Sequence, residues 1–239
     1  MPVIAYTTIC THKSLVAPNV YELRFTKPEG FAFKAGQFVL WDVPLIDNPK
    51  DIQPRAYSIA STPAESDLLF SIKLKEGGRA SVWIEQQLKV GDSVIMKGPF
   101  GLFTVDPTST KKLVLMATGA GIAPFRAHVK WLLEDQKSNR PVHLYFGVRN
   151  QTDFFWLDTF SALAAKHAHF HFYPCLSGDD ASWIGDRGRV QQVFEKTLLD
   201  RSEMKLYVCG APEMVSDIKK MALEKWGMEK KDLHVEGYI

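Results

Sequence analysis

Cysteine is scarce in this sequence, and its three cysteines, Cys10, Cys175 and Cys209, lie far apart. An odd number without Cys-x-x-Cys spacing excludes a disulfide framework, a CxxC zinc site and a four-cysteine iron–sulfur cluster carried by this chain alone. An excess of one charge is also absent, because 29 Lys and Arg stand against 27 Asp and Glu, a net charge of +2. This balance gives no indication of a nucleic-acid or membrane-surface partner.

Long hydrophobic runs are missing as well. No stretch has the apolar length that spans a bilayer, and residues 1–6 lack the basic segment that opens a signal peptide. We therefore expect a cytoplasmic protein with reduced thiols. The 239 residues, 46% of them hydrophobic, are enough for two modest domains or one large one.

The first hundred residues or so are typical of a small closed barrel. Short runs, many rich in β-branched and aromatic residues, alternate with turn signals of Gly, Pro, Asn and Asp. Only one helical pattern interrupts them, directly after two glycines. Such a pattern predicts a barrel domain over residues 1–104. The predicted strands are 3–10, 20–26, 38–43, 56–60, 68–74 and 92–97, and the predicted helix is 79–88.

The pattern changes after a connecting segment at residues 105–110. Beyond it, continuous apolar strands alternate with amphipathic helices. This alternation predicts a doubly wound parallel sheet, covered on both faces, over residues 111–239. The predicted strands are 113–117, 142–148, 170–176 and 205–209, and the predicted helices are 125–136, 155–166, 190–199 and 213–226.

Residues 55–61 place a cation, a phenol and two hydroxyls within one short strand-like run. On a strand, Arg55, Tyr57 and Ile59 point to one side and Ala56 and Ser58 to the other. A guanidinium can bind phosphate oxygens in a fork, and the neighbouring aromatic ring can stack on a planar ligand. An ordinary strand with an exposed arginine explains these residues equally well, and both interpretations stay open at this point.

A second candidate site lies between the first parallel strand and its helix. Thr118, Gly119 and Gly121 form a glycine loop there, and Pro124 suits a helix start. In this context a glycine loop indicates dinucleotide binding, whereas the alternative is a tight turn without a ligand. Proline in the last motif position argues against the ordinary NAD fingerprint.

Three further groups carry possible chemistry. Cys209 ends a parallel strand, where ligands usually bind, although an inert core thiol is the alternative. Glu236 and Tyr238 lie two residues apart, which an ordinary edge strand also explains. His167, His169 and His171 alternate, but no carboxylate clusters with them, and we expect no metal.

Taken together, the motifs resemble those of the ferredoxin–NADP reductase family over essentially the full length. The resemblance covers Arg-x-Tyr-Ser at 55–58, Gly-x-x-Ser at 78–81, Gly-Pro-x-Gly at 98–101, Gly-x-Gly-x-x-Pro at 119–124, Cys-Gly-x-Pro at 209–212 and Val-Glu-x-Tyr at 235–238. It implies a six-stranded antiparallel FAD-binding barrel followed by an NAD(P)-binding domain.

The resemblance also implies residue roles. Arg55 would hold the FAD pyrophosphate, and Tyr57 and Tyr238 would cover opposite faces of the isoalloxazine. The catalytic group would be Ser58 near flavin N5, with Cys209, Glu236 and Tyr238 at the nicotinamide. Cofactor contacts are expected at Arg55, Ala56, Tyr57, Ser58, Ile72, Lys73, Leu74, Gly78, Arg79, Ala80, Ser81, Thr118, Gly119, Gly121, Pro124, Arg149, Ser177, Arg189, Cys209, Gly210, Pro212, Met214 and Tyr238.

The implied activity is electron transfer between NAD(P)H and a one-electron carrier: ferredoxin, flavodoxin or an oxygenase component. The alternatives are a free-flavin or quinone reductase and a non-catalytic FAD subunit. We expect a monomer. Arg149 and Arg189 favour NADPH, whereas Asp179 and Asp180 do not, which leaves a slight lean to NADPH. Ile239 departs from plastid-type members of the family, which end at the tyrosine.

Overall fold

A computed structural model describes residues 3–238. The chain divides into two compact units, one of residues up to Val105 together with Arg126–Trp131, the other of Asp106–Phe125 and the residues from Leu132 onward. Residues 126–131, which the sequence placed in the second domain, therefore belong with the first unit. Across residues 3–238, no helix has the length and apolar character needed to cross a membrane.

The first unit is a six-stranded antiparallel barrel, as predicted. Its strands follow the order β4-β3-β6-β1-β2-β5, and the backbone N–H of Ala60, just past β4, donates to the carbonyl of Leu69 on β5 at 2.7 Å, which closes the sheet. The elements are β1 (Ala5–Ala17), β2 (Val20–Thr26), β3 (Phe38–Leu45), β4 (Asn48–Ser58), β5 (Asp67–Lys73), α1 (Arg79–Gln86) and β6 (Ser93–Phe100).

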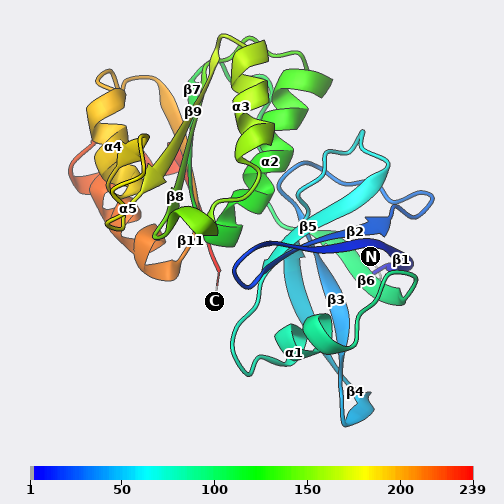
Figure 1. The fold of residues 1–239 in the computed structure, drawn as a ribbon. Helices are drawn as coiled ribbons and strands as arrows, with labels where there is room; N and C mark the ends of the chain where they lie inside the picture. Colours follow the sequence, from blue (N-terminus) through cyan, green and yellow to red (C-terminus); the bar gives the residue numbers. More distant parts are fainter. Residues whose placement is uncertain (1–2, 239) are drawn as a thin grey trace. The chain divides into compact units, whose positions relative to one another are not determined.

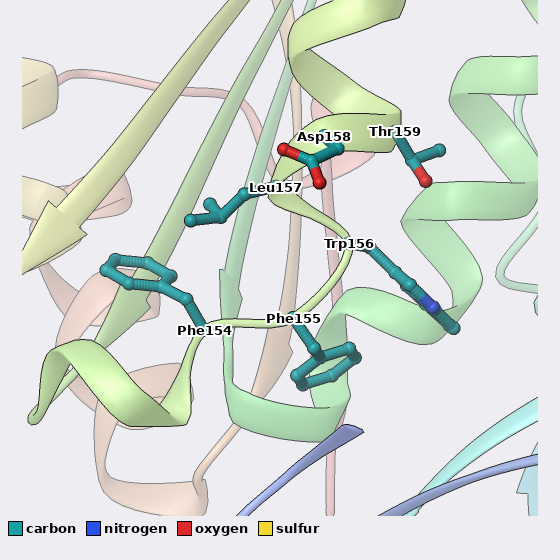
Figure 2. A pocket seen from close by; sticks show the side chains of 6 residues that line it. All are labelled: Phe154, Phe155, Trp156, Leu157, Asp158 and Thr159. Carbon is teal, nitrogen blue, oxygen red and sulfur yellow. The ribbon is translucent and has the colours of Figure 1, made fainter. Parts of the chain in front are cut away.

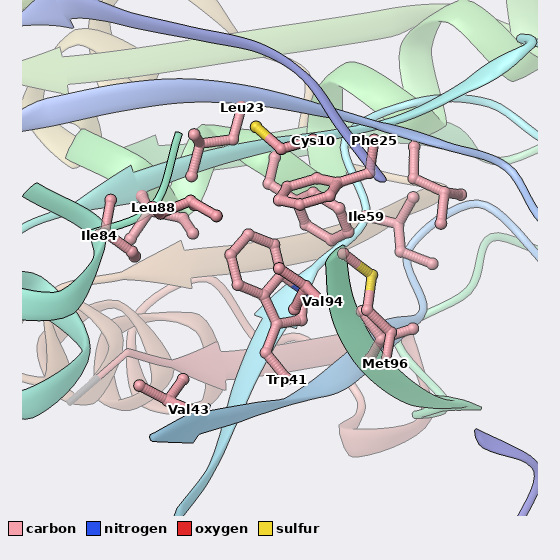
Figure 3. Close-up of a cluster of buried hydrophobic side chains, with 14 of the residues drawn as sticks. Cys10, Leu23, Phe25, Trp41, Val43, Ile59, Ile84, Leu88, Val94 and Met96 are labelled. Carbon is pink, nitrogen blue, oxygen red and sulfur yellow. The ribbon is translucent and has the colours of Figure 1, made fainter. Parts of the chain in front are cut away.

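The barrel encloses an aromatic core (Figure 3). Trp41 is fully buried and meets Phe25 and Phe70 edge-on, with ring centroids 4.8 and 4.9 Å apart. Ile84 of α1 and Leu88, just beyond that helix, join the same cluster. Alternate residues of the strands therefore fill one core, and α1 contributes to it.

Strand β4 is longer than the sequence indicated. We predicted a strand at 56–60, but β4 runs from Asn48 to Ser58 and pairs along β3. The strand contains two prolines, Pro49 and Pro54, a residue that usually interrupts a strand. They are tolerated because β4 ends the strand order and needs no N–H donors on its outer side.

The second unit is a parallel sheet, as predicted, but it has six strands rather than the four expected, in the order β10-β9-β8-β7-β11-β12. From the central β7 the chain adds strands first on one side and then on the other, so the order reverses there. The carboxyl end of such a switch strand is where α/β proteins bind ligands. The strands are β7 (Lys112–Thr118), β8 (Val142–Val148), β9 (Phe170–Leu176), β10 (Asp186–Arg187), β11 (Met204–Gly210) and β12 (Leu233–Gly237).

Helices cover this sheet on both faces. Figure 1 shows α3 on one face and α4 and α5 on the other, and apolar residues of α4 and α5 form a core cluster with β7, β8, β9 and β11. The helix predicted at 125–136 is instead α2 followed by a π-helical turn. The helical elements are η1 (Gly119–Ile122), α2 (Ala123–Lys130), η2 (Trp131–Asp135), η3 (Gln151–Asp153), α3 (Leu157–Lys166), α4 (Val190–Thr197), α5 (Pro212–Glu224) and η4 (Lys230–Asp232).

Candidate functional site

Arg55 and Tyr57 lie on the same face of β4. Arg55 pairs with Trp41 and Tyr57 with Val39, and both partners are fully buried, so the two side chains share the core-facing side. The ring of Tyr57 meets Trp41 at 4.7 Å between centroids and an angle of 62°. Burial raises the pKa of Tyr57 to about 12, so the phenol stays neutral at physiological pH.

Arg55 has only local partners among residues 3–238. Its guanidinium donates to the side-chain oxygen of Gln53 and to the carbonyl of Pro54, and no carboxylate there pairs with it. Ala56 is exposed on the opposite face, whereas Ser58 is buried. An arginine without a carboxylate partner beside a half-buried ring fits an anionic, planar ligand.

The predicted phosphate turn opens α1. Gly78 is the N-cap residue, and a Cβ built on it would lie 3.1 Å from the carbonyl oxygen of Lys75 and 3.2 Å from Oγ of Ser81. Oγ of Ser81 accepts a hydrogen bond from the N–H of Lys75 at 2.7 Å, which shapes the turn. Ala80 is buried at the start of the helix. A glycine turn with free helical N–H groups suits phosphate oxygens.

Other residues predicted to contact FAD have partners within the protein. Arg79 makes a two-pronged ion pair with Asp51 of β4, at 2.9 and 3.2 Å. Ile72 is buried and the side chain of Leu74 packs against the barrel core, so only Lys73 of this trio has an exposed side chain. FAD contact by these residues remains a prediction. The arginine, the ring and the glycine turn do fit the pyrophosphate and ring system of that cofactor.

The dinucleotide loop is built from two glycine turns packed against each other. Gly121 has no room for a side chain, since a Cβ would lie 2.4 Å from the carbonyl oxygen of Cys209. Gly210 adopts a φ of +143°, and a Cβ there would lie 2.3 Å from Oγ1 of Thr118. Gly119, with a φ of +52°, faces open space. The alternative interpretation, a tight turn without a ligand, therefore explains Gly121. Of these three glycines, only Gly119 leaves space for a ligand.

Other residues of this loop are held by the fold. Pro124 is buried in the first turn of α2, whereas Pro212 is exposed at the start of α5. Oγ1 of Thr118 accepts a hydrogen bond from the N–H of Ala211 at 3.1 Å. Met214 packs against the core of the second unit. Direct ligand contact by these four side chains remains a prediction.

Cys209, Glu236 and Tyr238 come together at the carboxyl ends of β11 and β12. Cys209 pairs directly with Glu236 in the parallel register, and the N–H of Tyr238 donates to the carbonyl of Gly210 at 2.9 Å. Burial raises the pKa of the Cys209 thiol well above its ordinary value; the Glu236 charge raises it further, and a hydrogen bond with Tyr238 opposes the shift. The thiol is therefore neutral and unreactive. Ile239 lies outside the described residues.

The candidate residues for the nucleotide's phosphate lie at the ends of β8, β9 and β10. Arg149 is exposed directly after β8, and Ser177, after β9, donates its hydroxyl to the carbonyl of Val148 at 3.1 Å. Arg189 has a side chain that is 70% exposed and lies 3.9 Å from Asp217. Both arginines are accessible to a phosphate group.

Two hollows of the second unit are lined by none of these residues. One, of about 440 Å³, is lined by six consecutive residues, 154–159, between η3 and α3 (Figure 2). The other, of about 520 Å³, is lined mainly by charged and hydroxyl side chains, Lys111 and Asp232 among them. The part of the chain that the structure describes contains no group of three metal-binding side chains.

One buried ion pair is not evident from the sequence. Arg126 of α2 is 7% exposed and makes two hydrogen bonds with Glu65, at 2.9 and 3.0 Å. A charged residue between the buried Phe125 and Ala127 was the available signal, because arginine is seldom buried unless it is paired.

Comparison with known proteins agrees with this architecture. Residues 8–105 match the oxidoreductase FAD-binding domain, and residues 115–220 match the oxidoreductase NAD-binding domain. These ranges correspond to the barrel and to most of the parallel-sheet unit.

Similar proteins include reductases and reductase components. Ferredoxin–NADP reductase B of Sorangium cellulosum is 33% identical over 93% of this chain and 93% of its own length. The reductase component DmpP of phenol 2-monooxygenase from Pseudomonas sp. (strain CF600) is 31% identical over 99% of this chain. The chain spans only 66% of that component, and 54% of the toluate 1,2-dioxygenase electron transfer component of Pseudomonas putida.

The structural likeness extends over almost every residue. The cytochrome P450 reductase GcoB of Amycolatopsis has a TM-score of 0.87 and 28% identity, covering 99% of this chain and 70% of GcoB. Together with a relative that is 33% identical over nearly its whole length, these matches establish that the chain belongs to the ferredoxin–NADP reductase family of FAD- and NAD(P)-binding oxidoreductases.

Proposed function

We propose that this chain takes electrons from NAD(P)H and delivers them to a one-electron protein carrier. The observation that carries the proposal is the cluster of Cys209, Glu236 and Tyr238 at the strand ends beside the Gly119 loop. FAD, when bound, would supply the chemistry that converts a two-electron hydride into single electrons, a task that no side chain performs. The protein's contribution is to bind, orient and protect.

The residues of the barrel would bind the cofactor. Arg55 would hold the pyrophosphate through its fork of N–H donors, together with the N–H groups near Gly78. Tyr57 would stack on the flavin ring, and Ser58 would donate a hydrogen bond to it. The alternation of Arg55 and Tyr57 on one face supports this division, because one strand then presents a cation and a ring to the same ligand.

The residues of the second unit would position the nicotinamide. Cys209 presents a neutral thiol, which packs against the ring without competing as a nucleophile or an acid. Glu236 would relay a proton. Tyr238 would supply an aromatic ring for stacking at the nicotinamide position.

NADPH is the nucleotide that we propose. Arg149 and Arg189 are exposed at neighbouring strand ends, where cations suit a 2′-phosphate. Against this, carboxylates after β9 suit the free ribose of NADH. Asp180, however, already accepts hydrogen bonds from the N–H and the hydroxyl of Ser182, at 3.0 and 2.7 Å, so it is poorly placed to bind ribose.

The electron acceptor would be a ferredoxin, a flavodoxin or an oxygenase component. The chain has three cysteines, one fewer than a four-cysteine iron–sulfur cluster needs, so the acceptor centre would be supplied by another protein or domain. We further propose that the chain acts as a monomer in the cytoplasm.

Steady-state assays would test this function. Purified protein loaded with FAD is mixed with NADPH or NADH and with a ferredoxin, a flavodoxin or free FMN, and reduction of each acceptor is followed. The proposal predicts rapid reduction of a protein carrier and slow reduction of FMN. Reduction of free FMN alone would support a free-flavin reductase instead.

A further inference from the structure

The segment that follows β4 is fixed on several sides. Residues 58–62 are all buried. The N–H of Ile59 donates to the carbonyl of Gln37 at 2.9 Å, and that of Ala60 donates to Leu69 at 2.7 Å. This segment continues directly from Tyr57 and Ser58, so its rigidity determines how accurately those side chains are held.

Arg126 binds this segment from a distant part of the sequence. Its guanidinium donates to the carbonyl of Ala60 at 2.9 Å while it pairs with both carboxylate oxygens of Glu65. Glu65 in turn accepts a hydrogen bond from the N–H of Thr62 at 2.7 Å. One guanidinium therefore bridges the two ends of a loop, from the buried Ala60 to the half-buried Glu65.

Both members of this pair are charged. Burial alone would raise the pKa of Glu65, but the hydrogen bonds and the charge of Arg126 hold it below its ordinary value. Arg126 is 7% exposed, and a cation at such a depth is stable only when its donors are satisfied. Arg126 makes a third hydrogen bond, to the backbone carbonyl of Ala60. Charge pairing with Glu65 does not require this bond.

The helix that carries Arg126 is fixed to the barrel at a second point. His128, two residues later, is fully buried, and its Nε2 lies 2.8 Å from the carbonyl oxygen of Phe103. Gly36 packs directly onto this ring, because a Cβ there would lie 2.1 Å from Nε2. Residues 126–131 are thus built into the first unit, and the guanidinium of Arg126 extends from a fixed base.

We propose that Arg126 is a positioning residue for the flavin site, which holds Tyr57 and Ser58 in place through the Ala60 carbonyl and Glu65. The identity of the ligand rests on the proposed function. Arg126 need not touch the cofactor. Arg126 restricts the motion of the strand end that contacts the cofactor. Less conformational entropy is therefore lost when FAD binds.

Hydrogen exchange and FAD binding together test this role. In Arg126→Gln, amide exchange in residues 58–66 of the FAD-free protein should quicken about tenfold, and FAD should bind about tenfold more weakly, equivalent to ~1.4 kcal/mol. Arg126→Lys should lie between this variant and the original chain, because an ammonium is a point charge without the planar fork. Glu65→Gln should resemble Arg126→Gln.

Arg201→Gln provides a matched control. That guanidinium also donates to a backbone carbonyl, of Glu195 at 2.7 Å, but in the second unit, so exchange in 58–66 and FAD affinity should stay unchanged. The proposal is overturned if Arg126→Gln leaves both readouts as they were, or if exchange quickens equally throughout the barrel. Neither readout needs electron transfer, so both decide the role of Arg126 even if NAD(P)H fails to reduce the protein.

Discussion

Gly121 lies so close to Cys209 that a Cβ on the glycine would stand 2.4 Å from the cysteine's carbonyl oxygen. The loops after β7 and β11 therefore meet backbone to backbone. Gly210 meets Thr118 in the same way. Two of the glycines that suggest a nucleotide site thus hold the strand ends together, whereas Gly119 faces open space.

Gly121→Ala should destabilise the protein. The added methyl group meets backbone atoms, which must shift, at a cost of about 2 kcal/mol. Denaturant unfolding of the two proteins, followed by fluorescence, would measure the difference. Gly119→Ala is the matched control: its methyl group enters open space, and the positive φ costs only about 1 kcal/mol.

The order of the two alanine variants should reverse for nucleotide binding: Gly119→Ala should lose more affinity than Gly121→Ala. Each variant is measured at a temperature where it is fully folded. Gly119→Ala should lose affinity because its methyl group occupies the space open to a pyrophosphate. Equal stability of the two variants would contradict the packing account of Gly121.

Arg55→Gln should weaken FAD binding by about 10- to 100-fold, the range expected for charge-assisted hydrogen bonds of ~1.5–3 kcal/mol. Fluorescence titration of FAD into the cofactor-free protein measures it. Arg55→Lys keeps the charge but loses the fork and should recover only part of the affinity. FAD affinity that is unchanged in Arg55→Gln would remove Arg55 from the cofactor site.

Stability should fall in acid because of His143. Burial, the neighbouring His171 and Lys112 lower the pKa of this histidine from 6.5 to about 4. Between those values the unfolded chain binds a proton that the folded chain does not, so the free energy of unfolding decreases as pH falls from about 6.5 to 4. The loss amounts to about 3 kcal/mol at most.

His143→Phe separates this effect from other acid effects. Phenylalanine keeps the stack against His171, whose ring centroid lies 4.7 Å away, but cannot titrate. The variant should gain stability relative to the original chain as pH falls from 7 to 4.5, measured by urea unfolding at each pH. Parallel curves for the two proteins would show that His143 does not titrate in this range.

Tyr238→Ser should tighten nicotinamide binding about five- to tenfold and relax the discrimination between NADPH and NADH. The physical reason is that the nucleotide no longer has to displace an aromatic ring, whose stacking contributes about 1 kcal/mol. Tyr238→Phe keeps the ring and should leave nucleotide affinity near its original value. Unchanged affinity for both nucleotides in Tyr238→Ser would mean that Tyr238 does not occupy the nicotinamide position.

The predictable part of the fold followed from alternation and apolar runs. The bounds predicted for β2, β8 and β9 agree with the structure, because those strands are bounded by clear polar or turn residues. β4 was too short in the prediction because proline suggests a break, and whether a strand lies at an edge depends on its partners. A charged residue inside α2 likewise gave no sign that Glu65, 61 residues earlier, lies beside it.

The candidate site, like the fold, has features that the sequence predicts and features that depend on tertiary contacts. The association of Cys209 with Glu236 follows from two parallel strands ending side by side, and the structure contains it. The different duties of Gly119 and Gly121 depend on a neighbouring loop 90 residues away in the sequence, so local pattern cannot distinguish them. The ion pair of Arg79 with Asp51 is also a tertiary contact, which local sequence pattern does not show.

Anaerobic mixing with nicotinamide nucleotides tests the central claim most directly. The purified protein, loaded with FAD, is mixed with NADPH and separately with NADH in a stopped-flow spectrophotometer, and absorbance near 450 nm is recorded. The account predicts rapid bleaching of the flavin band, faster with NADPH. A protein that binds no FAD, or whose flavin is bleached by neither nucleotide, would contradict it.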